Sequence, residues 1–353
     1  MKKVCFIVVI ISFILSGCMD KIEAEERGYV ITMGIDKGTE YKYDISFVVA
    51  KLTDQGNQSE GEVINISANN IVEALNKGNS LTNKLLYLGQ LKTVIFGKSI
   101  FETDNYISDI LSQLENNRDV NIKTIVLGTE GKALDINTAI GSNDLSAGIY
   151  IYDFYKNSSE KTSFTEKIEL GKMISDIDVN GSTVIPLISL EDDNIKIYSG
   201  VIVGQSNFKD VIPEKYMLSD IWLKNNGEGS VISDEQGRGL TILDNYCKYS
   251  FSNKDNKVVC NIEIESRGST NFAFDRTEKY EIEQNFETIV ENDIIEYIYF
   301  LRDTASCDAL GFSNKLKKYK TNLYYEYGEE QSFYNMEFEV DCNIKIKSTG
   351  LGG

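Results

Sequence analysis

Histidine is absent from the 353-residue chain, and its absence excludes several kinds of chemistry. Without an imidazole the chain cannot build a Ser-His-Asp or Cys-His nucleophile, nor a zinc site with histidine ligands. The six cysteines are dispersed and form no Cys-x-x-Cys pair. Neither a glycine-rich dinucleotide motif nor a Walker A motif occurs. The sequence therefore predicts no cofactor, no metal site and no enzymatic activity.

Basic residues are fewer than acidic ones: the chain has 36 lysines and arginines and 54 aspartates and glutamates, which gives a net charge of −18. Nucleic acid and anionic lipid headgroups repel such a chain. No basic stretch with interleaved aromatic residues occurs, so we expect no nucleic-acid partner. Proline occurs only twice, but aliphatic and aromatic residues are plentiful, which argues against a disordered chain.

The clearest signal lies at the start of the chain. Lys2 and Lys3 precede an apolar run, Val4–Leu15, which is shorter than the roughly 20 residues that span a bilayer. This pattern is typical of a signal peptide, and its ending, Leu15-Ser16-Gly17-Cys18, resembles the lipobox of bacterial lipoproteins. The resemblance implies cleavage after Gly17 and a diacylglycerol on Cys18, giving two acyl chains that anchor firmly. The alternative is an ordinary secretory signal with a chance cysteine.

Hydrophobic periodicity predicts strands and helices without strict alternation, which favours an α+β fold with several sheets covered by helices. Asn70 to Glu73 resembles a capping box that begins a helix. A long amphipathic helix is predicted over 277–301. Strands are predicted at Leu240–Phe251, Lys257–Ser266 and Met336–Lys347.

Two short motifs suggest chemistry but are better explained as polar turns or loops. Asp176 to Gly181 begins like a calcium-binding EF-hand loop, yet the twelfth position holds Leu187 where a glutamate is needed. Ser158 to Lys161 matches the Ser-x-x-Lys of penicillin-binding proteins, but the companion motifs are missing.

Cys247 and Cys260 lie on two consecutive predicted strands. A turn centred on Asn253-Lys254 makes them cross-strand partners, close enough for a disulfide or for two buried thiols in register. A turn centred on Asp255-Asn256 places Cys247 opposite Ile264 instead. Both registers remain open at this point, as does the state of Cys307 and Cys342.

Several segments, in this order along the chain, resemble the Ger(x)C spore germination lipoproteins. They are Gly17–Glu23, Gly34–Lys37, Leu86–Lys92 with Val94–Lys98, Asn117–Asp119, Ser306–Phe312 and Ile344–Gly350. The chain departs from the family pattern where Met19 replaces a usual tryptophan and Gln90 stands where a histidine is common.

The resemblance implies a role rather than a reaction: the non-enzymatic C subunit of a nutrient germinant receptor. Such subunits lie on the outer face of the spore inner membrane, beside A and B membrane subunits. The implied fold has three consecutive α+β domains, each a mixed or antiparallel sheet covered by helices. We expect a signal peptide at 1–17, an anchored linker at 18–27, and domains at 28–140, 141–235 and 236–353. The alternative function is a lipid-anchored solute-binding protein of an envelope transport system, with two similar lobes around one cleft.

Overall fold

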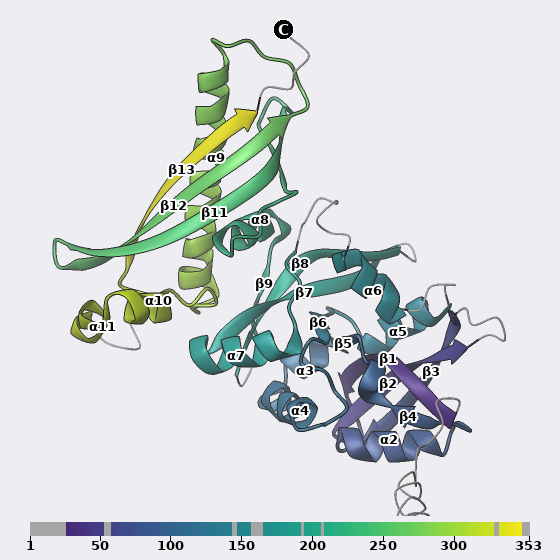
Figure 1. Cartoon of the computed structure of the whole chain (residues 1–353). Helices are drawn as coiled ribbons and strands as arrows, with labels where there is room; N and C mark the ends of the chain where they lie inside the picture. Colours follow the sequence, from purple (N-terminus) through teal and green to yellow (C-terminus); the bar gives the residue numbers. More distant parts are fainter. Residues whose placement is uncertain are drawn as a thin grey trace, which may run out of the picture.

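The computed structural model describes residues 26–52, 58–142, 147–156, 165–191, 194–205, 208–327 and 332–347. These residues form two β-sheets of different size, and helix α8 (Glu214–Leu223) lies between them (Figure 1). The signal peptide with Cys18 lies outside the described residues, as does the Ser158–Lys161 motif. The mixture of sheets and helices confirms the predicted α+β class.

The larger sheet has nine strands in the order β3-β2-β1-β5-β6-β7-β8-β9, and β4 pairs with the start of β1. Strands β1, β5, β6 and β7 run parallel, while the outer strands pair antiparallel. The strands are β1 (Arg27–Lys37), β2 (Tyr43–Leu52), β3 (Gln58–Ala68), β4 (Leu85–Tyr87), β5 (Thr93–Phe96), β6 (Ile125–Gly128), β7 (Ser182–Glu191), β8 (Asn194–Gly204) and β9 (Phe208–Ile212).

Helices pack around this sheet because each presents an apolar stripe to it. They are α2 (Ile71–Asn79), the 3₁₀ turn η2 (Leu88–Gln90), α3 (Lys98–Phe101), α4 (Tyr106–Glu115), α5 (Ala133–Ser142), α6 (Ala147–Lys156) and α7 (Leu170–Asn180). The predicted cap of α2 is confirmed, since the Asn70 side chain accepts a 2.8 Å hydrogen bond from the Glu73 N–H.

The sheet continues across residue 140, where a domain boundary is predicted. β6 and β7 meet in a single residue pair, Gly128 with Leu187, so the ladder is narrowest there. The boundaries at 140 and 235 stay predictions.

The smaller sheet has the order β10-β11-β12-β13 and carries the long helix α9 (Lys279–Tyr299) on one face (Figure 1). Its strands are β10 (Val231–Ser233), β11 (Gly239–Lys254), β12 (Lys257–Thr270) and β13 (Glu337–Lys347). The helix continues into a π-helical turn, η4 (Phe300–Thr304), and then α10 (Phe312–Tyr319) and α11 (Thr321–Tyr327). None of the helices in the described ranges is both long and apolar enough to cross a membrane.

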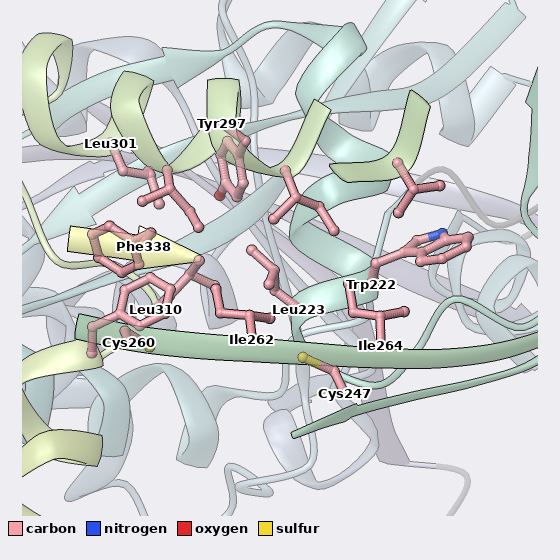
Figure 2. Packing of buried hydrophobic residues seen from close by; sticks show 14 of the residues in the cluster. Trp222, Leu223, Cys247, Cys260, Ile262, Ile264, Tyr297, Leu301, Leu310 and Phe338 are labelled. Carbon is pink, nitrogen blue, oxygen red and sulfur yellow. The ribbon is translucent and has the colours of Figure 1, made fainter. Parts of the chain in front are cut away.

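The core of the smaller body is continuous with the back of the larger sheet. Figure 2 shows Trp222 and Leu223 of α8 packed among residues of β12 and α9. Val184 and Ile202, from the larger sheet, belong to the same buried cluster. Helix α8 therefore contributes apolar surface to both sheets.

The β11–β12 hairpin decides between the two predicted registers for the cysteines and rules out the one that pairs Cys247 with Cys260. Its turn is Asp255-Asn256, both with positive φ, and Cys247 lies opposite Ile264 while Cys260 lies opposite Phe251. Asp and Asn tolerate the left-handed region that this tight turn requires, which explains why the turn is not at Asn253-Lys254. Four residues along a strand span about 13 Å, so the two cysteines are too far apart for a disulfide.

Candidate functional site at the junction of the two sheets

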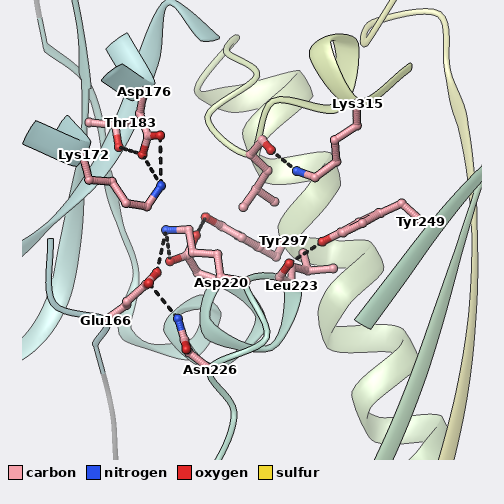
Figure 3. Close-up of polar contacts among 12 residues, drawn as sticks. Glu166, Lys172, Asp176, Thr183, Asp220, Leu223, Asn226, Tyr249, Tyr297 and Lys315 are labelled. Carbon is pink, nitrogen blue, oxygen red and sulfur yellow. Dashed lines mark hydrogen bonds and ion pairs between the residues drawn. The ribbon is translucent and has the colours of Figure 1, made fainter. Parts of the chain in front are cut away.

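A buried group of polar side chains lies where α8 meets α9. The Asp220 carboxylate on α8, with a side chain only 1% exposed, accepts 2.8 Å and 2.7 Å hydrogen bonds from the Tyr297 hydroxyl and the Lys224 ammonium (Figure 3). Lys224 is one helical turn after Asp220, so both side chains point to the same side of α8. Tyr297 comes from α9. This group therefore ties the helix between the sheets to the helix that covers the smaller sheet.

The same group reaches the larger body through Glu166. Its carboxylate lies 3.8 Å from the Lys224 ammonium and accepts a 2.7 Å hydrogen bond from Asn226 (Figure 3). Glu166 precedes the segment that leads into α7. Lys172 and Thr183 bind the neighbouring carboxylate, Asp176, at 2.8 Å and 3.1 Å. Residues from three separate parts of the chain thus meet in one network, which we call the junction network.

Burial and neighbouring charges together shift the pKa values of these groups. Burial raises the pKa of Glu166, and the charge of Lys224 opposes that rise. Burial alone would lower the pKa of Lys224, but the attraction of Asp220 and Glu166 outweighs it and raises that pKa. The Tyr297 pKa is raised well above its usual value by burial and by Asp220, so its hydroxyl stays neutral and donates.

A cleft with a volume of about 600 Å³ opens beside this network, between α7, the end of α8 and α10. Asn314 of α10 bridges its far side by donating 2.6 Å and 2.9 Å hydrogen bonds to Val179 and Asn180 of α7. The Lys315 ammonium donates to the Leu310 carbonyl and lies 4.8 Å from the Tyr249 ring centre. Burial lowers the pKa of Lys315.

The described contacts at the junction are hydrogen bonds and ion pairs that connect α7, α8 and α9. The two tyrosine hydroxyls at the junction, those of Tyr249 and Tyr297, have pKa values raised by burial, so both stay protonated at neutral pH. No cluster of three metal-ligating side chains occurs among the residues with described positions. The network instead offers a fixed set of hydrogen bonds that positions α7, α8 and α9 relative to one another.

Two family models match consecutive parts of the chain. The model described as "Spore germination protein N-terminal domain" matches residues 20–190, and "Spore germination B3/ GerAC like, C-terminal" matches residues 199–350. The chain belongs to the GerAC family of spore germination proteins.

Curated relatives of this GerAC family member come from Bacillus subtilis (strain 168). Putative spore germination protein YfkR is 22% identical over 390 residues, which cover 99% of this chain and 98% of that protein. Spore germination protein A3 is 22% identical over 198 residues, 55% of this chain, and the match spans only 53% of that relative. The crystal structure of the GerBC protein matches with a TM-score of 0.61 at 15% identity, covering 89% of this chain and 96% of that one, so the two share a fold.

The GerAC-like segments that carry the resemblance have structural roles in this chain. Asp36 of Gly34–Lys37 accepts 2.9 Å and 3.0 Å hydrogen bonds from the N–H groups of Ala133 and Leu134, which begin α5. Gly97 leaves room for it, since a Cβ there would lie 1.8 Å from the Asp36 carboxylate. The Asp36 carboxylate therefore caps the start of α5, where a negative charge is favoured.

Asp308 of Ser306–Phe312 repeats this arrangement at the second body. Its two carboxylate oxygens accept 2.7 Å hydrogen bonds from the Phe312 and Ser313 N–H groups at the start of α10. Gly311, with a φ of +68°, precedes the helix and packs against Asn180 of α7. The family segment therefore also places α10 against the cleft.

The remaining predicted sites are distributed as follows. Asp176 to Asn180 is the last turn of α7 and ends at Gly181, whose φ is +76°, rather than forming a separate loop. Cys247, Cys260, Cys307 and Cys342 are buried thiols in the smaller body. Sequence reasoning missed the junction network because its members are far apart in the chain. The one available signal was Asp220 and Lys224, four residues apart on either side of the apolar Ile221–Leu223 stretch.

Proposed function

We propose that this GerAC family member is the lipid-anchored C subunit of a spore nutrient germinant receptor, acting by interaction and not by catalysis. The observation that carries the proposal is the match of both family domains, in order, over nearly the whole chain after the lipobox-like segment. We propose that a diacylglycerol on Cys18 holds it on the outer face of the spore inner membrane. Its partners there are the receptor's A and B membrane subunits.

The architecture supports this role over a solute-binding protein. The two described sheets have nine and four strands in unrelated orders, so they are not the two similar lobes that a hinged solute-binding protein needs. The junction network suits a subunit that presents two bodies to its partners in a fixed orientation.

Deletion of the gene tests the receptor role. We expect the deleted spores to lose germination with the cognate nutrient while germination through unrelated triggers survives. A complemented strain is the control. Spores that respond normally to every nutrient the strain recognises, in a strain without a second gene of this family, would refute the role.

A Cys18→Ala variant tests the anchor separately. We expect the uncleaved or released chain and the same loss of nutrient response as in the deletion. Cys5→Ala, which changes a cysteine inside the apolar run, is the matched control and should leave processing unchanged. A Cys18→Ala chain that is cleaved after Gly17 and remains membrane-bound at the normal level would contradict the anchor.

A further inference from the structure

Side chains of α9 bind the backbone along one edge of the smaller sheet, the strand β13. β13 is the last strand in the order, and an edge strand exposes a row of unpaired N–H and C=O groups. Here the carboxylates of α9 accept hydrogen bonds from that row. The three bonds join the N–H groups of Cys342, Ile344 and Ile346 to Glu291, Glu287 and Glu283 at 2.9, 2.8 and 2.8 Å.

The geometry explains why three glutamates fit one strand. Glu283, Glu287 and Glu291 are spaced by four residues, which is about 6.0 Å along a helix. Alternate residues of a strand are about 6.6 Å apart, so each glutamate meets the next outward N–H. Like charges at this spacing normally destabilise a helix. Here the three glutamates are explained by their hydrogen bonds to β13. We call Glu283, Glu287 and Glu291 the glutamate row.

The solvent face of β13 has a second feature that points to a specific partner. Its exposed charges change sign along the strand, from Glu337 and Glu339 at the start to Lys345 and Lys347 at the end. If two copies of β13 pair antiparallel about residue 342, Glu337 faces Lys347 and Glu339 faces Lys345 of the other copy. Opposite charges directly across an antiparallel pair are stabilising. The strand is therefore complementary to a second copy of itself.

The glutamate row occupies the donors that this pairing needs. In the register centred on residue 342, the outward N–H groups of the two strands bond to each other's carbonyls, and those of Cys342, Ile344 and Ile346 are held by α9. The acidic residues of β13 already form ion pairs within the chain, such as the 3.0 Å pair of Glu339 with Lys254. These pairs are exposed and contribute little to stability, so the lysines of a second copy can replace their partners.

We propose that β13 is a latent self-pairing edge: two copies of this chain join antiparallel through β13, and the glutamate row of α9 keeps the edge closed. The interface follows two-fold symmetry, so each copy contributes the same strand. Withdrawal of the row opens the edge and makes the chain a dimer.

The first experiment compares three triple variants of the full-length chain in mild detergent. E283A/E287A/E291A removes the row, E283Q/E287Q/E291Q keeps an acceptor oxygen at each position, and E281A/D293A/E296A removes the same charge from exposed positions of α9. We expect only the first to double its protein mass by light scattering, with at least tenfold tighter self-association than the parent. When this variant is diluted to a monomer, we expect at least tenfold faster amide exchange in the peptide that contains β13, and we expect the protection to return as the dimer forms.

Charge reversal then tests the register. In the E283A/E287A/E291A background, K345E/K347E should return the chain to a monomer, and adding E337K/E339K should restore the dimer. The single variant Glu287→Ala, which keeps two of the three bonds, should self-associate more weakly than the triple variant but more tightly than the parent. A monomeric triple variant, with or without faster exchange, would overturn the proposal, as would a dimer that ignores the charge reversals.

Discussion

Replacing Asp220 by alanine tests whether the junction network stabilises the fold as its geometry indicates. The change removes an acceptor from the buried Tyr297 hydroxyl and the nearest carboxylate from Lys224. Removing one partner of a buried ion pair costs about 3–5 kcal/mol. The Lys224 side chain is 22% exposed and Glu166 remains 3.8 Å away, so we expect the low end, about 3 kcal/mol.

A double-mutant cycle isolates the bond between the two helices. Tyr297→Phe removes only the hydroxyl and should cost about 1–2 kcal/mol. In the Asp220→Ala background the same change should cost at least about 1 kcal/mol less, because its partner is already gone. Asp178→Ala, which removes an exposed carboxylate of α7, is the matched control and should stay within about 0.5 kcal/mol of the parent.

The assay is urea unfolding followed by tryptophan fluorescence. The chain has one tryptophan, Trp222, two residues after Asp220, so the signal reports on α8 directly. Trp222 is buried and donates a 3.1 Å hydrogen bond to Ser230, so its emission should shift when α8 leaves the core. A loss below about 1 kcal/mol for Asp220→Ala, or zero coupling in the cycle, would refute the role of the network.

Three further predictions concern other parts of the chain. Asn70→Ala should cost about 1 kcal/mol in unfolding followed by circular dichroism, while Asn70→Asp, which retains the cap of α2, should not. The thiols of Cys260 and Cys342 should resist alkylation by iodoacetamide until urea unfolds the chain, because burial raises their pKa; rapid labelling seen by mass spectrometry in the native state would contradict this. Asp234 is desolvated, but its hydrogen bonds to Arg238 lower its pKa overall, so its contribution to stability is present above about pH 3.9 and lost below it. The stability difference between parent and Asp234→Asn should therefore shrink from pH 7 to pH 3, and a constant difference would disprove the assignment.

The sequence was most informative where one element determines its own structure. The helix predicted over 277–301 is α9, Lys279–Tyr299, because its apolar residues repeat with a single period and face one sheet. The last strand is also predicted within one residue of β13, since its side chains alternate strictly between core and solvent.

Register and long-range contacts were harder to predict. The β11–β12 hairpin could turn at two places in a polar stretch, and the positive φ values of Asp255 and Asn256 decide between them. Glu166 lies shortly before α7 in the chain, yet its carboxylate is 3.8 Å from the ammonium of Lys224, 58 residues later. Such a pairing depends on how the two sheets meet, and no local pattern in the chain encodes it.

The spacing of the glutamate row also limits its length. Four helical residues rise about 6.0 Å and two strand residues about 6.6 Å, so each further bond adds about 0.6 Å of mismatch. After three bonds the offset reaches about 1.2 Å, near the tolerance of a hydrogen bond. The next position on α9 is Ile295, and the outward N–H groups of Val340 and Phe338 lie beyond the row. The helix and the strand thus fall out of step toward the start of β13, and that end is where a pairing strand would first find open donors.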